Sequence, residues 1–160
     1  MTGRPPDAGR AVPARLTARV IPSPGHLLLI AAGGAAGTAV RASLQALWPS
    51  SAGTWPWATF GINVAGSFLL AALLEVLSAG PDKGWRRGVR LGAGTGLLGG
   101  FTTYSTFSVE VVLGLRAGTT LLTAGYAAAS VALGVGAAIL AGRGTRLALR
   151  RQRDAVSGRR

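Results

Sequence analysis

Uncharged and mostly apolar segments dominate the chain between short polar stretches. Three of them, residues 42–74, 91–109 and 117–142, contain no charged side chain. Apolar runs of about 18 residues or more are candidates for membrane-spanning helices. A soluble domain would place charges throughout its helices, so the pattern predicts an integral membrane protein.

The polar interruptions divide the apolar segments into four predicted transmembrane helices, which gives an all-α fold. We expect these helices at about residues 27–48, 57–77, 91–115 and 119–142. Helices of this length cross a hydrocarbon layer of about 30 Å at a rise of about 1.5 Å per residue. The chain then consists of a disordered basic tail (1–25), a transmembrane domain (26–142) and an arginine-rich tail (143–160) that begins as an extension of the fourth helix.

The first predicted helix places two glycines and an arginine on one face. Gly33, Gly37 and Arg41 follow one another at four-residue spacing. Small residues at this spacing let two helices approach closely in a membrane. An arginine within a span is costly unless it is paired or hydrated. Arg41 therefore either reaches the membrane surface from the last two turns or attracts anions at the mouth of a pathway.

Polar residues also form stripes on the second and fourth predicted helices. Thr59, Asn63 and Ser67 lie at four-residue spacing, and Tyr126 and Ser130 share a face in the same way. A buried amide such as that of Asn63 needs hydrogen-bond partners. In a membrane it marks either a helix contact or a lined path.

The third predicted helix contains the most unusual stretch of the chain, residues 91–110. It carries five glycines followed by a dense series of hydroxyl side chains, Thr102, Thr103, Ser105, Thr106 and Ser108. Non-helical backbone is tolerated at membrane depth only where it is buried in protein or lines a water-filled path. We therefore predict that the third helix is interrupted over Gly94–Thr103 and that this stretch is the working part of the protein.

Charge fixes the expected orientation. The chain has 17 basic and five acidic residues, a net charge of +12. Four basic residues lie in the N-terminal tail, four in the second predicted loop and seven in the C-terminal tail, against Arg116 alone in the other loops. The positive-inside rule then places both termini in the cytoplasm. Because the basic residues avoid the apolar body, we expect attraction to anionic lipid and no nucleic-acid partner.

The available chemistry argues against an enzyme. The chain has no cysteine, one histidine, no cluster of carboxylates and no recognisable pair of nucleophile and base. Hydroxyls, an amide, an arginine and the positive edges of aromatic rings suit a small anion. An interrupted helix also frees carbonyls, which bind hard cations, and N–H groups, which favour anions. Four short helices do not easily enclose a pathway, so we expect a two-fold dimer.

Four segments together carry a resemblance to a known family. The run GGFTTYSTFSVE, from Gly99 to Glu110, closely resembles the third-helix signature of the Fluc (CrcB) fluoride channels. GGAAGTAVR at Gly33–Arg41 is similar to the first-helix motif of that family, and TFGINVAGSFLLA at Thr59–Ala71 to its second. Tyr126 and Ser130 fit the fourth helix, so the resemblance covers about residues 27–140.

The resemblance implies a fold, an ion and a set of roles. It implies an antiparallel dimer of four-helix subunits in the cell membrane, with two pathways that export fluoride from the cytoplasm and give fluoride resistance. It implies a structural sodium ion at the dimer centre, held by the backbone carbonyls of Gly99 and Thr102. The fluoride pathway it implies consists of the amide of Asn63, the rings of Tyr104 and Phe107 and the polar groups of Tyr126, Ser130 and Thr59, with Arg41 near a vestibule.

Two positions depart from the family pattern. Tyr104 stands where the family usually has phenylalanine, and its hydroxyl adds a donor and acceptor beside the path. Gly134 stands where a fourth-helix hydroxyl often occurs, which removes one polar group from the track.

The charge bias and the family resemblance together leave the partner open. A homodimer of this family inserts each chain in both orientations, which calls for weak bias in the loops. The strong bias of this chain favours its being one half of an oppositely oriented heteropair.

Two other kinds of protein compete with a channel as the interpretation of this sequence. A four-helix multidrug transporter would need an acidic residue deep in the first helix, which here has Arg41 and no acid. A non-transporting membrane assembly subunit would not explain the hydroxyl-rich stretch after the glycines.

Overall fold

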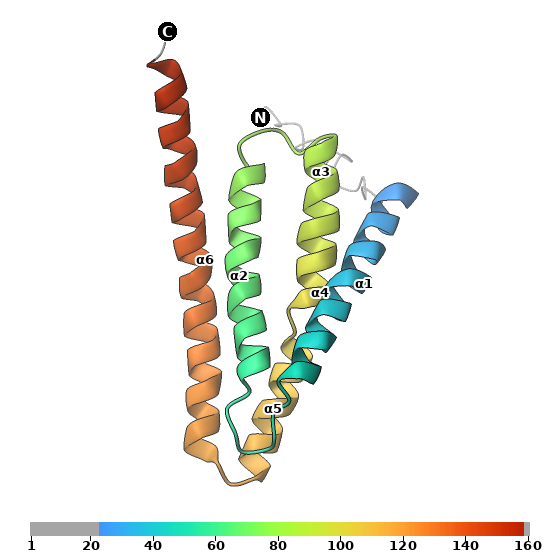
Figure 1. Cartoon of the computed structure of the whole chain (residues 1–160), viewed down its shortest axis with the longest axis vertical. Helices are drawn as coiled ribbons and strands as arrows, with labels where there is room; N and C mark the ends of the chain where they lie inside the picture. Colours follow the sequence, from blue (N-terminus) through green and yellow to red (C-terminus); the bar gives the residue numbers. More distant parts are fainter. Residues whose placement is uncertain (1–22, 159–160) are drawn as a thin grey trace, which may run out of the picture.

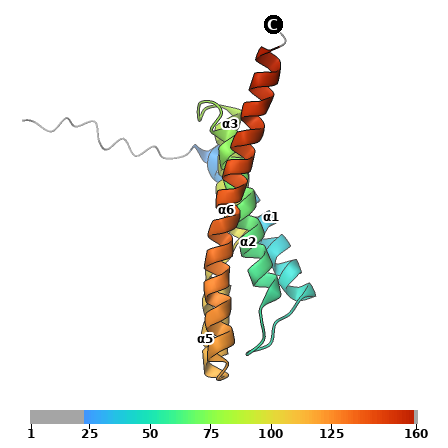
Figure 2. The same cartoon turned by 90° about the vertical axis from the view of Figure 1, so that its left-hand side faces the viewer.

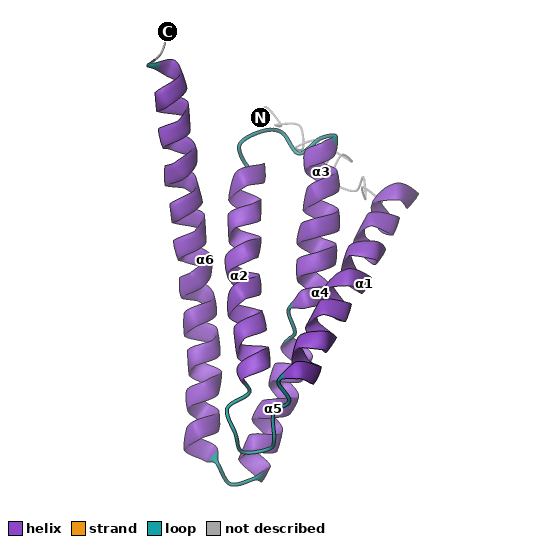
Figure 3. Ribbon diagram, in the orientation of Figure 1, coloured by secondary structure: helices purple, strands orange, loops and turns teal. Residues whose placement is uncertain are grey.

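The computed structural model describes residues 23–158, and every regular element in this range is a helix. Most of the predicted N-terminal tail lies outside the described residues, but Pro24 and Gly25 already belong to the first helix. Figures 1 and 3 show an elongated bundle in which one helix projects well beyond the others.

Three long helices and one segmented pass make up the bundle. In chain order the elements are α1 (Pro24–Leu47), α2 (Trp57–Leu77), α3 (Trp85–Val89), the π-helix η2 (Arg90–Leu98), α4 (Gly99–Phe101), α5 (Tyr104–Arg116) and α6 (Thr120–Ser157). Figure 1 shows that the chain reverses direction after α1, after α2 and after α5. The start of α1, the loop between α2 and α3 and the end of α6 therefore lie at one end of the bundle.

Helices α1, α2 and α6 are each long and apolar enough to cross a membrane. Their positions confirm the predicted helices at 27–48 and 57–77, with boundaries shifted by a few residues at most. Helix α6 begins one residue after the predicted start and continues without interruption past residue 142 to Ser157. The arginine-rich segment up to that residue is therefore a helical continuation of α6.

Large apolar side chains lie on the outside of the bundle, and its small interior contains both apolar and polar side chains. Leu28, Leu121 and Leu140 are exposed, whereas Thr59 and Thr123 are buried. In water this distribution would be unfavourable, because apolar surface would remain hydrated. It is the distribution expected of a protein whose solvent is lipid.

Glycines bring α1 into backbone contact with η2 and α4. A Cβ atom at Gly33 would overlap the carbonyl oxygen of Gly92, and one at Gly37 would overlap that of Leu97. A Cβ at Gly100 would likewise overlap the backbone of Gly34. These contacts confirm the predicted close approach along the glycine face of the first helix, since no larger residue fits there.

The break in the third pass is shorter than the sequence predicts. Only Thr102 and Thr103 adopt extended backbone, with ψ of 156° and 121°. The prediction that Gly94–Thr103 is interrupted is wrong in extent, because residues 94–101 remain helical. The glycines allow close packing on α1 there, and they do not unwind the chain.

The bundle is thin in one direction. Figure 2 shows it edge-on, with α1 diverging from α6 toward the end where α1 meets the loop to α2. Helix α2 packs against α6, and α1 packs against η2 and α4. Residues 23–158 therefore form little more than one layer, and no other segment among these residues covers its broad faces.

Candidate ion pathway beside the broken helix

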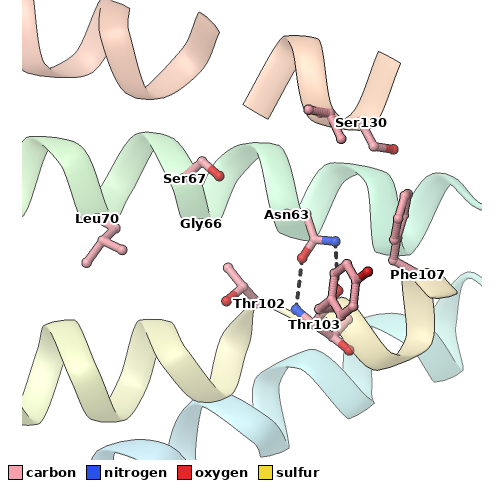
Figure 4. A pocket seen from close by; sticks show the side chains of 10 residues that line it. Asn63, Gly66, Ser67, Leu70, Thr102, Thr103, Phe107 and Ser130 are labelled. Carbon is pink, nitrogen blue, oxygen red and sulfur yellow. Dashed lines mark hydrogen bonds between the residues drawn. The ribbon is translucent and has the colours of Figure 1, made fainter. Parts of the chain in front are cut away.

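The extended residues of the break are held by a side chain from a neighbouring helix. The Nδ2 of Asn63 on α2 donates to the carbonyl oxygen of Thr103, and the N–H of Thr103 donates to Asn63 Oδ1, both at 2.9 Å (Figure 4). The amide thus replaces the helical partners that Thr103 would otherwise have. The same pair of bonds fixes the point at which the helix stops.

Thr103 also starts the next helix. Its Oγ1 accepts a hydrogen bond of 3.1 Å from the N–H of Thr106, which is the N-cap arrangement of α5. In an uninterrupted α-helix the N–H groups of Thr103 and Thr106 would donate to the carbonyls of Gly99 and Thr102. Both N–H groups are diverted to side chains instead, so these two carbonyls lose their helical donors.

An open pocket of about 300 Å³ lies beside the break. Its lining comes from three passes of the chain: Asn63, Gly66, Ser67, Leu70, Thr102, Thr103, Tyr104, Phe107, Ser130 and Val131 (Figure 4). Four of the six predicted pathway residues, Asn63, Tyr104, Phe107 and Ser130, therefore line one space. Within the described part of the chain, the buried Oγ of Ser130 has no hydrogen-bond partner.

The other two predicted pathway residues belong to a partly buried hydrogen-bond chain centred on Glu110. The hydroxyl of Thr59 donates to Glu110 Oε1 and the hydroxyl of Tyr126 donates to Glu110 Oε2, both at 2.7 Å. Thr59 in turn accepts from the Nε2 of Gln45 at 3.2 Å. The hydroxyl hydrogens of Thr59 and Tyr126 therefore point to a carboxylate in this structure.

Aromatic rings link the pocket with the hydrogen-bond chain. The ring centroids of Tyr104 and Phe107 lie 6.0 Å apart, those of Phe107 and Tyr126 5.4 Å, and those of Tyr126 and Trp55 5.7 Å. Tyr104 is 81% exposed, on the open face of the bundle. Ring edges carry partial positive charge, so a file of rings can favour an anion without a fixed ionic charge.

Arg41 turns toward the break. Its Nε donates to the carbonyl oxygen of Gly100 at 3.1 Å, and its Nη1 donates to Gln45 Oε1 at 3.4 Å. The partly buried guanidinium is thus paired with a backbone carbonyl and a side-chain amide, which lowers the cost of a charge within a membrane helix. Whether Arg41 reaches the membrane surface or lies at a vestibule stays a prediction.

Carbonyl oxygens at the break are the groups suited to a metal ion. No group of three or more histidine, cysteine, aspartate or glutamate side chains occurs within residues 23–158. A hard cation such as sodium prefers oxygen ligands, including backbone carbonyls. The Gly99 and Thr102 carbonyls, deprived of their helical donors, have the right chemistry for it.

Sequence reasoning missed Glu110 and Gln45 as members of the site. Glu110 lies three residues after Phe107, hence on the same side of α5. An acid this close to an uncharged segment of a membrane protein is a signal of function that could have singled it out. Gln45 carries no comparable signal, since its contact with Thr59 depends on how α1 and α2 meet.

These features define a helical membrane protein with a polar, aromatic-lined pocket beside a broken helix. Residues 28–143 match the family described as CrcB-like protein, Camphor Resistance (CrcB). Similar proteins include Fluoride-specific ion channel FluC 1 of Cutibacterium acnes, 50% identical over 107 residues, which are 66% of this chain and 75% of that protein. Fluoride-specific ion channel FluC 2 of Leifsonia xyli subsp. xyli is 52% identical over 120 residues, 72% of this chain and 79% of that one. The chain belongs to the CrcB family.

Proposed function

We propose that this protein is a fluoride-selective channel that lets fluoride leave the cytoplasm down its electrochemical gradient. The choice of fluoride as the ion is supported by the names of the similar proteins, which are fluoride-specific ion channels. The observation that carries the proposal is the pocket at the break, which Ser130 lines together with Asn63 and Phe107, and the buried hydroxyl of Ser130 has no hydrogen-bond partner among residues 23–158. The proposed result for the cell is fluoride resistance.

Fluoride is small and strongly hydrated, so a dry path must replace its water with other donors. Ser130 offers its hydroxyl, and Asn63 offers the second hydrogen of its amide, since only one is used on Thr103. The rings of Tyr104 and Phe107 add favourable electrostatics without a charge that would trap the ion. Conduction requires binding weak enough for release. The hydroxyls of Thr59 and Tyr126 could donate to fluoride only after they break their hydrogen bonds to Glu110.

A second subunit completes the proposed channel. The bundle forms a thin layer and leaves Tyr104 exposed, so another chain would cover the open side of the pocket. We propose four transmembrane passes per subunit, with α3, η2, α4 and α5 as the third, and an antiparallel pairing of subunits. A sodium ion bound by the Gly99 and Thr102 carbonyls would hold the two breaks together by charge, and it would not be conducted.

The test is fluoride efflux from liposomes that contain the purified protein, measured against chloride. Asn63→Asp keeps the acceptor for Thr103 but replaces the amide donor with a negative charge. Phe107→Ile removes the ring edges, whereas its matched control Phe107→Tyr keeps them. Loss of a donor worth ~1.5–3 kcal/mol lowers the fluoride rate about ten- to hundredfold.

We expect that loss in Asn63→Asp and Phe107→Ile, with Phe107→Tyr close to wild type. Size-exclusion chromatography checks that the variants remain assembled. Undiminished fluoride efflux in both variants would refute the assigned roles. Chloride efflux as fast as that of fluoride would refute the proposed selectivity.

A further inference from the structure

The last part of α6 lies beyond the segment that matches the family. The match ends at residue 143, while α6 continues to Ser157. We call residues 144–157 the C-terminal extension. It holds four arginines and one aspartate. Its charge therefore lies outside the segment that matches the family.

The extension stands beside another basic segment. Figure 1 places it at the same end of the bundle as the loop between α2 and α3. Residues 78–90, which include that loop, carry four further basic residues and one aspartate. Two adjoining clefts of about 160 and 570 Å³ lie between the extension and the end of α2 with its loop, and they share Ala79, Leu149 and Arg153 in their linings.

The clefts have a strong excess of positive charge. Arg146, Arg150 and Arg153 line the smaller cleft together with one acid, Glu75. Arg146 pairs with that acid through two hydrogen bonds of 2.9 and 3.0 Å. Within residues 23–158, neither Arg150 nor Arg153 has an ion-pair or hydrogen-bond partner. Two guanidinium groups therefore remain available to an anion.

The clefts also present apolar surface at the end of the membrane-spanning helices. Leu149 and Val156 line the larger cleft beside Arg86 and Arg153. Trp85, 65% exposed, lies next to this region with its ring 4.9 Å from the guanidinium carbon of Arg86. Tryptophan is typical of the membrane surface, and guanidinium groups bind phosphate in two-pronged geometry.

We propose that these clefts bind the headgroup phosphate of an anionic phospholipid at the membrane surface. Arg150 and Arg153 contact the phosphate, and Leu149 and Val156 contact the glycerol and upper acyl chains. The apolar lining and the position at the helix ends favour a lipid over free phosphate. The site is independent of the proposed channel function.

The experiment measures lipid retained by the full-length protein in neutral detergent, using native mass spectrometry with phosphatidylglycerol or phosphatidylcholine added. The cleft variant Arg150→Gln/Arg153→Gln is compared with Arg143→Gln/Arg151→Gln. The control removes the same charge from the same stretch of α6, but its arginines do not line either cleft. Each arginine removed should lower the affinity for phosphatidylglycerol about fivefold, so we expect the cleft variant to bind this lipid about thirtyfold more weakly.

We expect the control to retain phosphatidylglycerol as wild type does, and phosphatidylcholine to bind weakly to all three proteins. Equal loss in both double variants would mean general surface attraction and would overturn the site. Inorganic phosphate or a short RNA that competes as well as phosphatidylglycerol would overturn the choice of a lipid. If the cleft variant cannot be isolated, the single variants Arg150→Gln and Arg153→Gln replace it, with about a fivefold loss expected in each.

Discussion

At the scale of single residues, Glu110 is the junction of the site. Its two carboxylate oxygens accept hydrogen bonds from α2 and α6, so one side chain of α5 ties three passes together. The predicted pathway residues therefore fall into two sets, those that donate hydrogen bonds to Glu110 and those that do not. Thr59 and Tyr126 serve Glu110, while the hydroxyl of Ser130 and one amide hydrogen of Asn63 remain for the pocket.

Replacing Glu110 by alanine should leave two buried hydroxyls without their acceptor. We expect Glu110→Ala to lower the free energy of unfolding by ~1–3 kcal/mol, and Glu110→Gln to lower it less because an acceptor oxygen remains. Unfolding in detergent, followed by circular dichroism, measures the change. Asp82→Ala is the control, since it removes a partly exposed pair with Arg90 at 3.1 Å and should cost at most ~1 kcal/mol. Equal losses in the alanine variants would contradict the central role of Glu110.

At the scale of the elements, contact between the backbones of α1 and η2 positions the break. Gly37 lies against Leu97 and Phe101, immediately before the extended residues. Gly66 on α2 also lies close to the break, against the side-chain methyl group of Thr102. The two helices thus hold the break from either side, and Asn63 supplies the hydrogen bonds that their backbones cannot.

A methyl group at Gly37 should therefore force α1 away from η2. We expect Gly37→Ala to destabilise the protein by ~1–3 kcal/mol, the usual cost of overfilling a packed interior. The matched control is Gly144→Ala, where the added carbon meets no atom within 4 Å in the same type of helix. That change should be neutral or stabilising by up to ~1 kcal/mol. Thermal unfolding of both variants compares them, and a control as unstable as Gly37→Ala would contradict this account.

The sequence predicts the helices better than it predicts their connections. Apolar length and small-residue spacing are local, so α1, α2 and the contact at Gly33 follow from the chain alone. The extent of the break does not, because it depends on Asn63, which is 40 residues away from Thr103. The acceptor role of Glu110 likewise depends on Thr59 and Tyr126 being brought together from two other helices.

At the scale of the whole molecule, nearly all basic residues lie at one end of the bundle or in the two terminal tails. Fifteen basic residues fall in the tails and the second loop, against Arg116 alone in the other two loops. Such a bias favours one orientation in the membrane. An antiparallel channel then needs a partner inserted the other way, which is why we propose a heteropair of oppositely oriented homologues.

Expression of this chain alone in fluoride-sensitive cells tests that proposal. We expect a C-terminal tag to be accessible only from the cytoplasm, and fluoride resistance to remain incomplete without a partner. A control with Lys83, Arg86, Arg87 and Arg90 changed to glutamine should show a measurable outward-facing fraction, because the bias is smaller. Full resistance, or a wild-type tag found on both sides, would show that the chain forms the channel by itself.

The unbroken course of α6 has a practical consequence for imaging. The protein has a mass of only 16.1 kDa, and most of such a bundle is hidden in detergent or lipid. Because α6 reaches Ser157 without a hinge, a soluble marker domain joined in helical register at that residue would turn rigidly with the bundle. At ~1.5 Å per residue, the extension places such a marker about 20 Å beyond residue 143. Electron microscopy could then align particles on the marker.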